Sequence, residues 1–153
     1  MLIDTNLLLF AVDEASPHHE RARRWLAEQL NGDRPVGIPW ESLTAFMRIV
    51  TNSRIYRDPL DSDQAWDCVS EWLSAPGVWI PLPTERHADV LGLLMTRYGA
   101  TGNLIPDAHM AALALEHGLV VCSADGDFAR FSEIRLLNPL TEPGGFGVVP
   151  ADL

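Results

Sequence analysis

The chain has 153 residues, close to the usual size of one domain, and 47% of them are hydrophobic, enough to form a core. Charged residues make up 21%, which is not the composition of a disordered chain, and the formal net charge of −10 argues, taken alone, against binding nucleic acid. No apolar run reaches the roughly 18 residues of a membrane span. An acid at position 4 precedes any apolar segment of a signal peptide, so we expect a cytoplasmic protein with no membrane partner.

Short apolar runs alternate with longer stretches of helical periodicity along the first half of the chain. The expected elements, in order, are a strand at 2–3, a helix at 5–12, a helix opened by Ser16-Pro17 that runs to about Leu30, a strand at 36–38, and a helix beginning near Pro39 or Trp40. A polar, arginine-bearing loop over 52–60 follows.

The second half continues the alternation. The expected elements are a helix opened by Asp61-Ser62, a strand-like run over 77–82, a helix from Thr84 to Tyr98 closed by Gly99, a helix from Pro106 to His117 closed by Gly118, a strand over 119–122, a short helix over 128–131, and a last strand over 134–137. This order predicts an α/β fold around a mainly parallel sheet. We expect residues 1–140 to form one domain and 141–153, which contain three glycines and two prolines, to be a loosely held tail.

Four acids occupy similar points of this alternating pattern. Asp4 follows the first strand, Glu41 and Asp107 begin helices, and Asp125, with Asp127 after it, follows a buried strand. Each acid alone has a local explanation, because helix N-termini and turns favour carboxylates. Ligands collect at the carboxyl ends of parallel strands, however, and four carboxylates gathered there would repel one another without a cation. Together they predict a divalent metal site.

Oxygen ligands without histidine or cysteine suit Mg²⁺ or Mn²⁺. One such ion can lower the pKa of a bound water, and a second ion about 4 Å away can stabilise the leaving oxygen of a phosphodiester. The predicted chemistry is hydrolysis of a phosphodiester bond, and the number of ions stays open.

The acidic segments resemble the four signature segments of the PIN-domain nucleases, and the size and layout resemble the VapC-like toxins of toxin–antitoxin pairs. The segments that carry the resemblance are Asp4-Thr5-Asn6, Glu41 early in a helix, Pro106-Asp107, and Ser123-Ala124-Asp125-Gly126-Asp127-Phe128. The resemblance covers about residues 1–140. It implies a three-layer α/β/α sandwich around a mainly parallel sheet, bound Mg²⁺ or Mn²⁺, and cleavage of RNA. It also implies a homodimer and a small antitoxin that blocks the site.

The same resemblance assigns roles to individual residues. The catalytic and metal-binding acids that it implies are Asp4, Glu41, Asp107 and Asp125, with Asp127 as a candidate additional ligand. Supporting roles fall to Asn6, which matches a position that orients the first acid, and to Ser123, which matches the hydroxyl position before the fourth acid. How Asp125 and Asp127 divide the fourth role stays open.

All eleven basic residues are arginine, a side chain that holds phosphate with a bidentate fork. Arg48, Arg54 and Arg57 follow the helix of Glu41 and are candidate RNA ligands, as are the arginines of residues 21–24. The alternatives are that these arginines solvate helix faces or contact the antitoxin. The five tryptophans favour core and dimer contacts over a platform for stacking bases.

Other functions fit part of the sequence. A phosphatase of the haloacid dehalogenase type would use Asp4 as nucleophile. It also requires an aspartate where Asn6 stands and a lysine, and the chain has no lysine. A phospho-acceptor receiver domain is excluded because it requires a lysine as well. A PIN-like module that binds RNA or a partner without cutting remains the alternative, although the complete acidic set argues against it. We therefore predict a metal-dependent endoribonuclease that is the toxin of a toxin–antitoxin pair.

Overall fold

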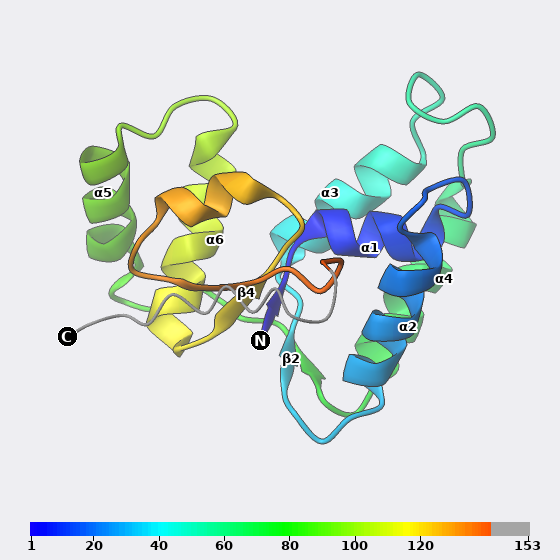
Figure 1. Cartoon of the computed structure of the whole chain (residues 1–153), viewed down its shortest axis with the longest axis horizontal. Coiled ribbons are helices and arrows are strands. Elements are labelled where there is room, and N and C mark those ends of the chain that lie inside the picture. The colour runs from blue at the N-terminus through cyan, green and yellow to red at the C-terminus, as the bar shows by residue number, and fades with distance from the viewer. Residues whose placement is uncertain (142–153) are drawn as a thin grey trace. The chain divides into compact units, whose positions relative to one another are not determined.

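The computed structural model describes residues 1–141, so the predicted tail lies outside the described residues except for Thr141. The chain divides into two compact units (Figure 1). The N-terminal unit is Ile3–Ile80, and the C-terminal unit consists of Met1–Leu2 and the chain from Pro81 onward. The strands form a five-stranded sheet in the order β3-β2-β1-β4-β5, in which β1 is Leu2–Ile3. The expected α/β fold is confirmed.

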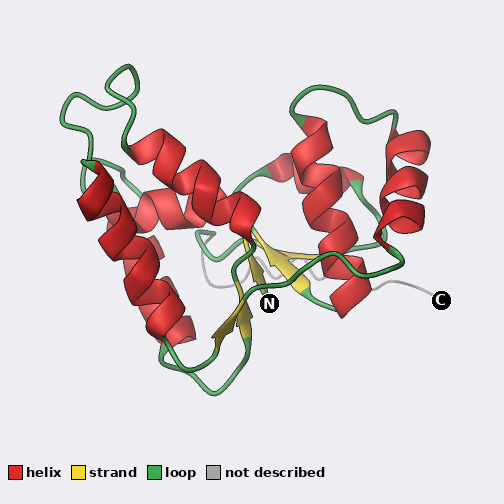
Figure 2. Ribbon diagram, turned by 180° about the vertical axis from the view of Figure 1, so that it is seen from behind, coloured by secondary structure: helices red, strands yellow, loops and turns green. Residues whose placement is uncertain are grey.

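The N-terminal unit combines helices with the paired strands β2 and β3 (Figures 1 and 2). The helices are α1 (Thr5–Val12), α2 (His19–Leu30), α3 (Trp40–Val50) and α4 (Ser62–Ser74). Strand β2 (Val36–Gly37) pairs in parallel with β3 (Val78–Trp79). Helix α1 packs against α2 and α3, and α3 packs against α4.

Helix α3 shows why this unit holds together. Leu43, Phe46 and Val50 recur at helical spacing and are buried. The Phe46 ring meets Trp72 of α4 edge to face, with 4.8 Å between the ring centroids. Helix α4 begins at a capping box, in which Asp61 and Gln64 exchange side chain to backbone hydrogen bonds. Apolar periodicity and capping residues, both read from the sequence, thus fix these two helices.

The C-terminal unit is built around one buried helix. Its elements are α5 (His87–Tyr98), α6 (Leu104–His117), β4 (Val120–Cys122), the short 3₁₀ helix η1 (Gly126–Arg130) and β5 (Arg135–Leu137). Helix α6 packs against α5, β4 and η1 (Figure 1), and its alanines and Leu113 are buried in the core. Strands β4 and β5 are parallel, with Val121 opposite Leu136.

Glycine ends both long helices of this unit, as the sequence predicted. Gly99 and Gly118 have φ values of 57° and 65°, the left-handed conformation that side chains disfavour. Their backbone N–H groups bond carbonyls of the preceding turn, which closes α5 and α6.

Two helices begin later than expected because a cap-like residue forms a turn of its own. The carbonyl of Ser16 accepts the N–H of His19 at 3.1 Å, and α2 starts at His19 instead of Pro17. The carbonyl of Thr84 likewise accepts the N–H of His87 at 3.0 Å, and α5 starts there. The sequence predicted that both residues open a helix directly, but each forms a separate turn and the helix begins after that turn.

Helix α6 begins earlier than expected, at Leu104, so Pro106 is its third residue. Proline fits there because the first backbone N–H groups of a helix have no partner within it. Asp107 still lies in the first turn.

Two other expected elements differ in type or length. The short helix expected at 128–131 is the 3₁₀ helix η1, and only Val78–Trp79 of the run at 77–82 is a strand. No helix of the described chain is long and apolar enough to cross a membrane.

Candidate functional site

Asp4 lies at the junction of β1 and α1, where it caps the helix. Its Oδ1 accepts the backbone N–H of Thr5 at 2.6 Å, and its Oδ2 accepts the side-chain amide of Asn6 at 2.7 Å. Both carboxylate oxygens therefore have fixed donors, in a half-buried position. Hydrogen bonds of this kind fix the orientation of a carboxylate, as a metal ligand requires.

Glu41 lies in the first turn of α3 and is exposed. The next residue, Ser42, is buried, and its hydroxyl donates to the carbonyl of Ile3 at 2.9 Å. The segments that carry Asp4 and Glu41 are therefore joined within the N-terminal unit, although they are far apart in the sequence.

The remaining acids belong to the C-terminal unit. Asp107 is half-buried in the first turn of α6. Asp125 caps η1, its Oδ1 accepting the N–H of Asp127 at 2.8 Å, and its own N–H donates to the hydroxyl of buried Ser123 at 3.0 Å. The carboxylate of Asp127 pairs with Arg130 at 3.4 Å. Asp125 is thus positioned by its own turn, whereas Asp127 is engaged by a cation.

Within residues 1–141, no group of three or more histidine, cysteine, aspartate or glutamate side chains is arranged to hold a metal ion. It stays a prediction that one cation is shared by the four signature acids Asp4, Glu41, Asp107 and Asp125. The donor chemistry fits it, because every candidate ligand is a carboxylate oxygen, the type that Mg²⁺ and Mn²⁺ prefer.

Residues 1–134 match the family described as the PIN domain. The chain belongs to the PIN-domain family. Ribonuclease VapC37 of Mycobacterium tuberculosis is 42% identical over 138 residues, covering 90% of this chain and 96% of that relative. Ribonuclease VapC33 of the same species is 37% identical over 139 residues, covering 91% and 97%. These relatives place the chain among the VapC ribonucleases, and the resemblance seen in the sequence is confirmed.

The fold also has a match among solved structures. A chain of VapBC2 from Rickettsia felis, solved bound to a DNA fragment from the promoter, matches with a TM-score of 0.67 at 18% identity. The match covers 90% of this chain and 96% of that chain. At this identity the likeness shows the fold, and the expected α/β/α sandwich of a PIN domain is confirmed.

The candidate RNA-binding arginines of this PIN domain differ in their surroundings. Arg48 is exposed in the last turn of α3, and Arg54 and Arg57 are exposed in the loop after it. Arg23 of α2 instead pairs with Glu20 at 3.3 Å, which fits a solvated helix face.

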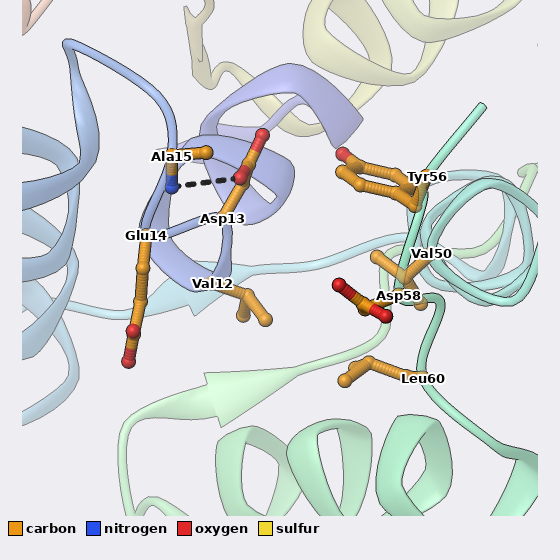
Figure 3. A pocket seen from close by; sticks show the side chains of 8 residues that line it. All are labelled: Val12, Asp13, Glu14, Ala15, Val50, Tyr56, Asp58 and Leu60. Atoms are coloured by element: carbon orange, nitrogen blue, oxygen red, sulfur yellow. Dashed lines mark hydrogen bonds between the residues drawn. The ribbon is translucent and has the colours of Figure 1, made fainter.

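A cavity of about 440 Å³ lies beside the same loop in the N-terminal unit (Figure 3). Its lining comes from the end of α1 and from the segment after α3: Val12, Asp13, Glu14, Ala15, Val50, Tyr56, Asp58 and Leu60. Burial, with the nearby charge of Asp13, raises the pKa of Tyr56. The signature acids do not line this cavity, and the sequence did not predict it.

The sequence also missed a partly buried network between α5 and α6. His87 Nδ1 lies 2.6 Å from Glu116 Oε2, and His87 Nε2 lies 2.9 Å from His109 Nδ1. Burial alone would raise the pKa of Glu116, but hydrogen bonds from Thr84 and His87 outweigh burial and lower it. The available signal was that His109 and Glu116 are about two turns apart on one helix. This network joins the two helices of the C-terminal unit.

Proposed function

We propose that this VapC-type ribonuclease hydrolyses RNA phosphodiester bonds with the help of Mg²⁺ or Mn²⁺, as the toxin of a toxin–antitoxin pair. Family membership supports RNA as the substrate class, since relatives at 37–42% identity are named ribonucleases. The observation that carries the metal dependence is the carboxylate of Asp4, whose two oxygens have fixed donors in Thr5 and Asn6.

The proposed ligands are the four signature acids. In our assignment Asp4, Glu41, Asp107 and Asp125 bind the cation, Asn6 orients Asp4, and Ser123 holds the turn of Asp125. The ion pair between Asp127 and Arg130 supports Asp125 as the main fourth acid.

These carboxylates give the reaction its dependence on metal. A divalent cation held by them would supply positive charge to the scissile phosphate and make a bound water more acidic. Without the cation, the acids repel the phosphate of the substrate. Cleavage is therefore expected to require the ion and not merely to be enhanced by it.

Local cations would offset the net charge of −10 where RNA binds. We assign this role to Arg48, Arg54 and Arg57, which are exposed along the end of α3 and the loop that follows. Salt-dependent RNA binding that weakens on Arg→Ala changes is the expected signature, because each phosphate contact releases counterions.

The partner that we propose is a small antitoxin. The solved chain of similar fold comes from VapBC2, bound to promoter DNA. By analogy with that assembly, this chain would be held inactive by its antitoxin in the cytoplasm. A homodimer is the proposed state of the free toxin, following the family resemblance.

The deciding experiment is RNA cleavage with Mn²⁺, comparing wild type with Asp4→Asn and Asp107→Asn. We expect each variant to lose at least about 100-fold in rate, since each removes one metal-binding charge. Asp89→Asn is the matched control, because Asp89 also lies in the first turn of a helix of the C-terminal unit and is exposed. Full cutting by either signature variant would refute the assignment.

A thermal measurement separates the nuclease from the module that binds without cutting. Mn²⁺ should raise the Tm of wild type by relieving repulsion among the acids, and should raise it less in Asp4→Asn. Equal shifts in the two proteins would mean that the ion binds elsewhere.

A further inference from the structure

Helix α3 presents a polar and aromatic face to solvent. Residues at its buried positions include Ser42, Leu43, Phe46 and Val50. Trp40, Glu41, Thr44 and Arg48 are exposed. Trp40, Thr44 and Arg48 recur every four residues, and Glu41 lies three residues before Thr44, so all four share the exposed side of the helix.

Trp40 does not lie in the core, which was one of the two places that the sequence favoured for the tryptophans. Its exposed fraction is 41%, whereas Trp72 of α4 is 6% exposed. No aromatic ring of the described residues stacks on it. Tryptophan is buried on average, and this ring is exposed one residue from a proposed metal ligand.

The other two residues of this face differ in what they can offer. The Thr44 hydroxyl donates to the carbonyl of Trp40 at 2.7 Å, so it is committed to its own helix. Arg48 forms no ion pair with any described residue, and its guanidinium is available to an anion. The face thus carries a free ring at one end and a free cation ~12 Å further along the axis.

We propose that Trp40 stacks on a nucleobase of the RNA strand next to the scissile phosphate, and that Arg48 holds a backbone phosphate of the same strand. The inference rests on the proposed function, because Glu41 links Trp40 to the reacting phosphate. Single-stranded RNA offers unstacked bases, and aromatic side chains receive them with little dependence on sequence. Trp40 is then a substrate-positioning residue of the ribonuclease, and it takes no part in proton transfer or metal binding.

The test begins with wild type, Mn²⁺ and short single-stranded oligoribonucleotides of random sequence, from which one cleaved sequence is chosen. For that RNA, Trp40→Ala should raise KM by about 5- to 150-fold, the range expected for one base stacked on an aromatic ring, with kcat little changed. Trp40→Phe should fall between wild type and Trp40→Ala. Trp40→Leu, which keeps an apolar side chain without an aromatic face, should resemble Trp40→Ala and replaces it if that variant does not fold.

Stacking has a direct readout as well. With 2-aminopurine placed at each nucleotide beside the cut, wild type should quench its fluorescence at one position in stopped-flow traces recorded before cleavage. Trp40→Leu should lose that quenching. Two controls should behave as wild type: Trp66→Leu, an exposed tryptophan on α4, and Thr44→Ala, on the same face of α3.

The outcomes separate this inference from the function on which it rests. Unchanged KM and unchanged quenching in a Trp40 variant, with wild-type cleavage intact, would overturn the role of Trp40 and leave the ribonuclease assignment standing. Absence of any cleavage by wild type with Mn²⁺ would overturn both.

Discussion

The hydroxyl of Ser42 donates a 2.9 Å hydrogen bond to the carbonyl of Ile3, and both residues are fully buried. This bond joins the first turn of α3 to the end of β1 within the N-terminal unit. Glu41 precedes Ser42 and Asp4 follows Ile3 in the chain. One buried bond therefore constrains the backbone beside two of the signature acids, and water cannot replace it.

Ser42→Ala should destabilise the chain by about 1–3 kcal/mol, because it removes the donor to a buried carbonyl. Urea unfolding measures this, and RNA cleavage by the same variant should fall because Glu41 loses its anchor. Thr44→Ala is the control, since that hydroxyl is exposed and bonds only within α3. Equal free energies of unfolding for the two variants would contradict the role given to Ser42.

Asn6→Ala should weaken Mn²⁺ binding or cleavage by about 10- to 100-fold, the usual cost of removing a group that orients a metal ligand. The variant deletes the amide that donates to Asp4 Oδ2 and leaves the Thr5 N–H in place. Titration calorimetry measures the affinity for Mn²⁺, and a cleavage assay measures the rate of RNA hydrolysis.

Asn31→Ala supplies the comparison for Asn6. Asn31 belongs to the same unit, and its amide donates to the backbone carbonyl of Ala27 on an exposed surface. The Asn31→Ala variant should bind Mn²⁺ with the affinity of wild type. If both asparagine variants lose affinity equally, the loss reflects the unit as a whole and not the orientation of Asp4.

Local signals made much of the fold predictable. The helix at Thr5–Val12 and the glycine ends at Gly99 and Gly118 match the expected positions because short-range capping and periodicity determine them. The starts of α2 and α5 were wrong by two or three residues, since a residue that can cap a helix can also close a separate turn first.

Contacts between distant segments were not predictable in the same way. The bond from Ser42 to Ile3 and the pair of His87 with Glu116 join residues 39 and 29 positions apart. The sequence favoured core or dimer contacts for the tryptophans as a group. Trp40 lies outside the core because its exposure depends on how α3 packs, and a dimer contact stays a prediction. The signature acids could be named from the sequence, but the hydrogen bonds that orient Asp4 required coordinates.

Glu116→Gln should make the stability of the folded chain fall less steeply as the pH is lowered. Hydrogen bonds from Thr84 and His87 lower the pKa of Glu116 in the folded chain below its ordinary value, despite burial. A group with a lowered folded pKa contributes stability above its unfolded pKa, about 4.3, and loses it as pH falls through the folded value.

Thermal unfolding followed by circular dichroism between about pH 3 and pH 6 measures this contribution, within the range where carboxyl groups titrate. Wild type should lose Tm more steeply than Glu116→Gln at the acid end. Glu85→Gln, an exposed neighbour in the same unit, should keep the wild-type slope. Parallel profiles for wild type and Glu116→Gln would show that the network does not stabilise the charged carboxylate.

Cys122 should resist alkylation in the folded chain. The residue is fully buried at the end of β4, and burial raises the pKa of its thiol to about 12. Cys68 is half-buried on α4, where burial and the charges of Glu71 and Asp67 also raise its pKa. Since the thiolate is the reactive form, iodoacetamide at about pH 8 should modify Cys68 slowly and Cys122 only after denaturant is added.

Peptide mass spectrometry over time distinguishes the two thiols, and Cys68→Ser isolates the signal of Cys122. In that variant the alkylation rate of Cys122 in the folded chain should depend on opening of the C-terminal unit, so this rate should rise with urea concentration. Substitutions that loosen β4 should also raise the rate at which Cys122 is alkylated. Ser42→Ala lies in the other unit, so it should raise this rate only to the extent that it lowers the free energy of global unfolding. Rapid modification of Cys122 without denaturant would mean that the core around β4 is open to solvent, contrary to its burial.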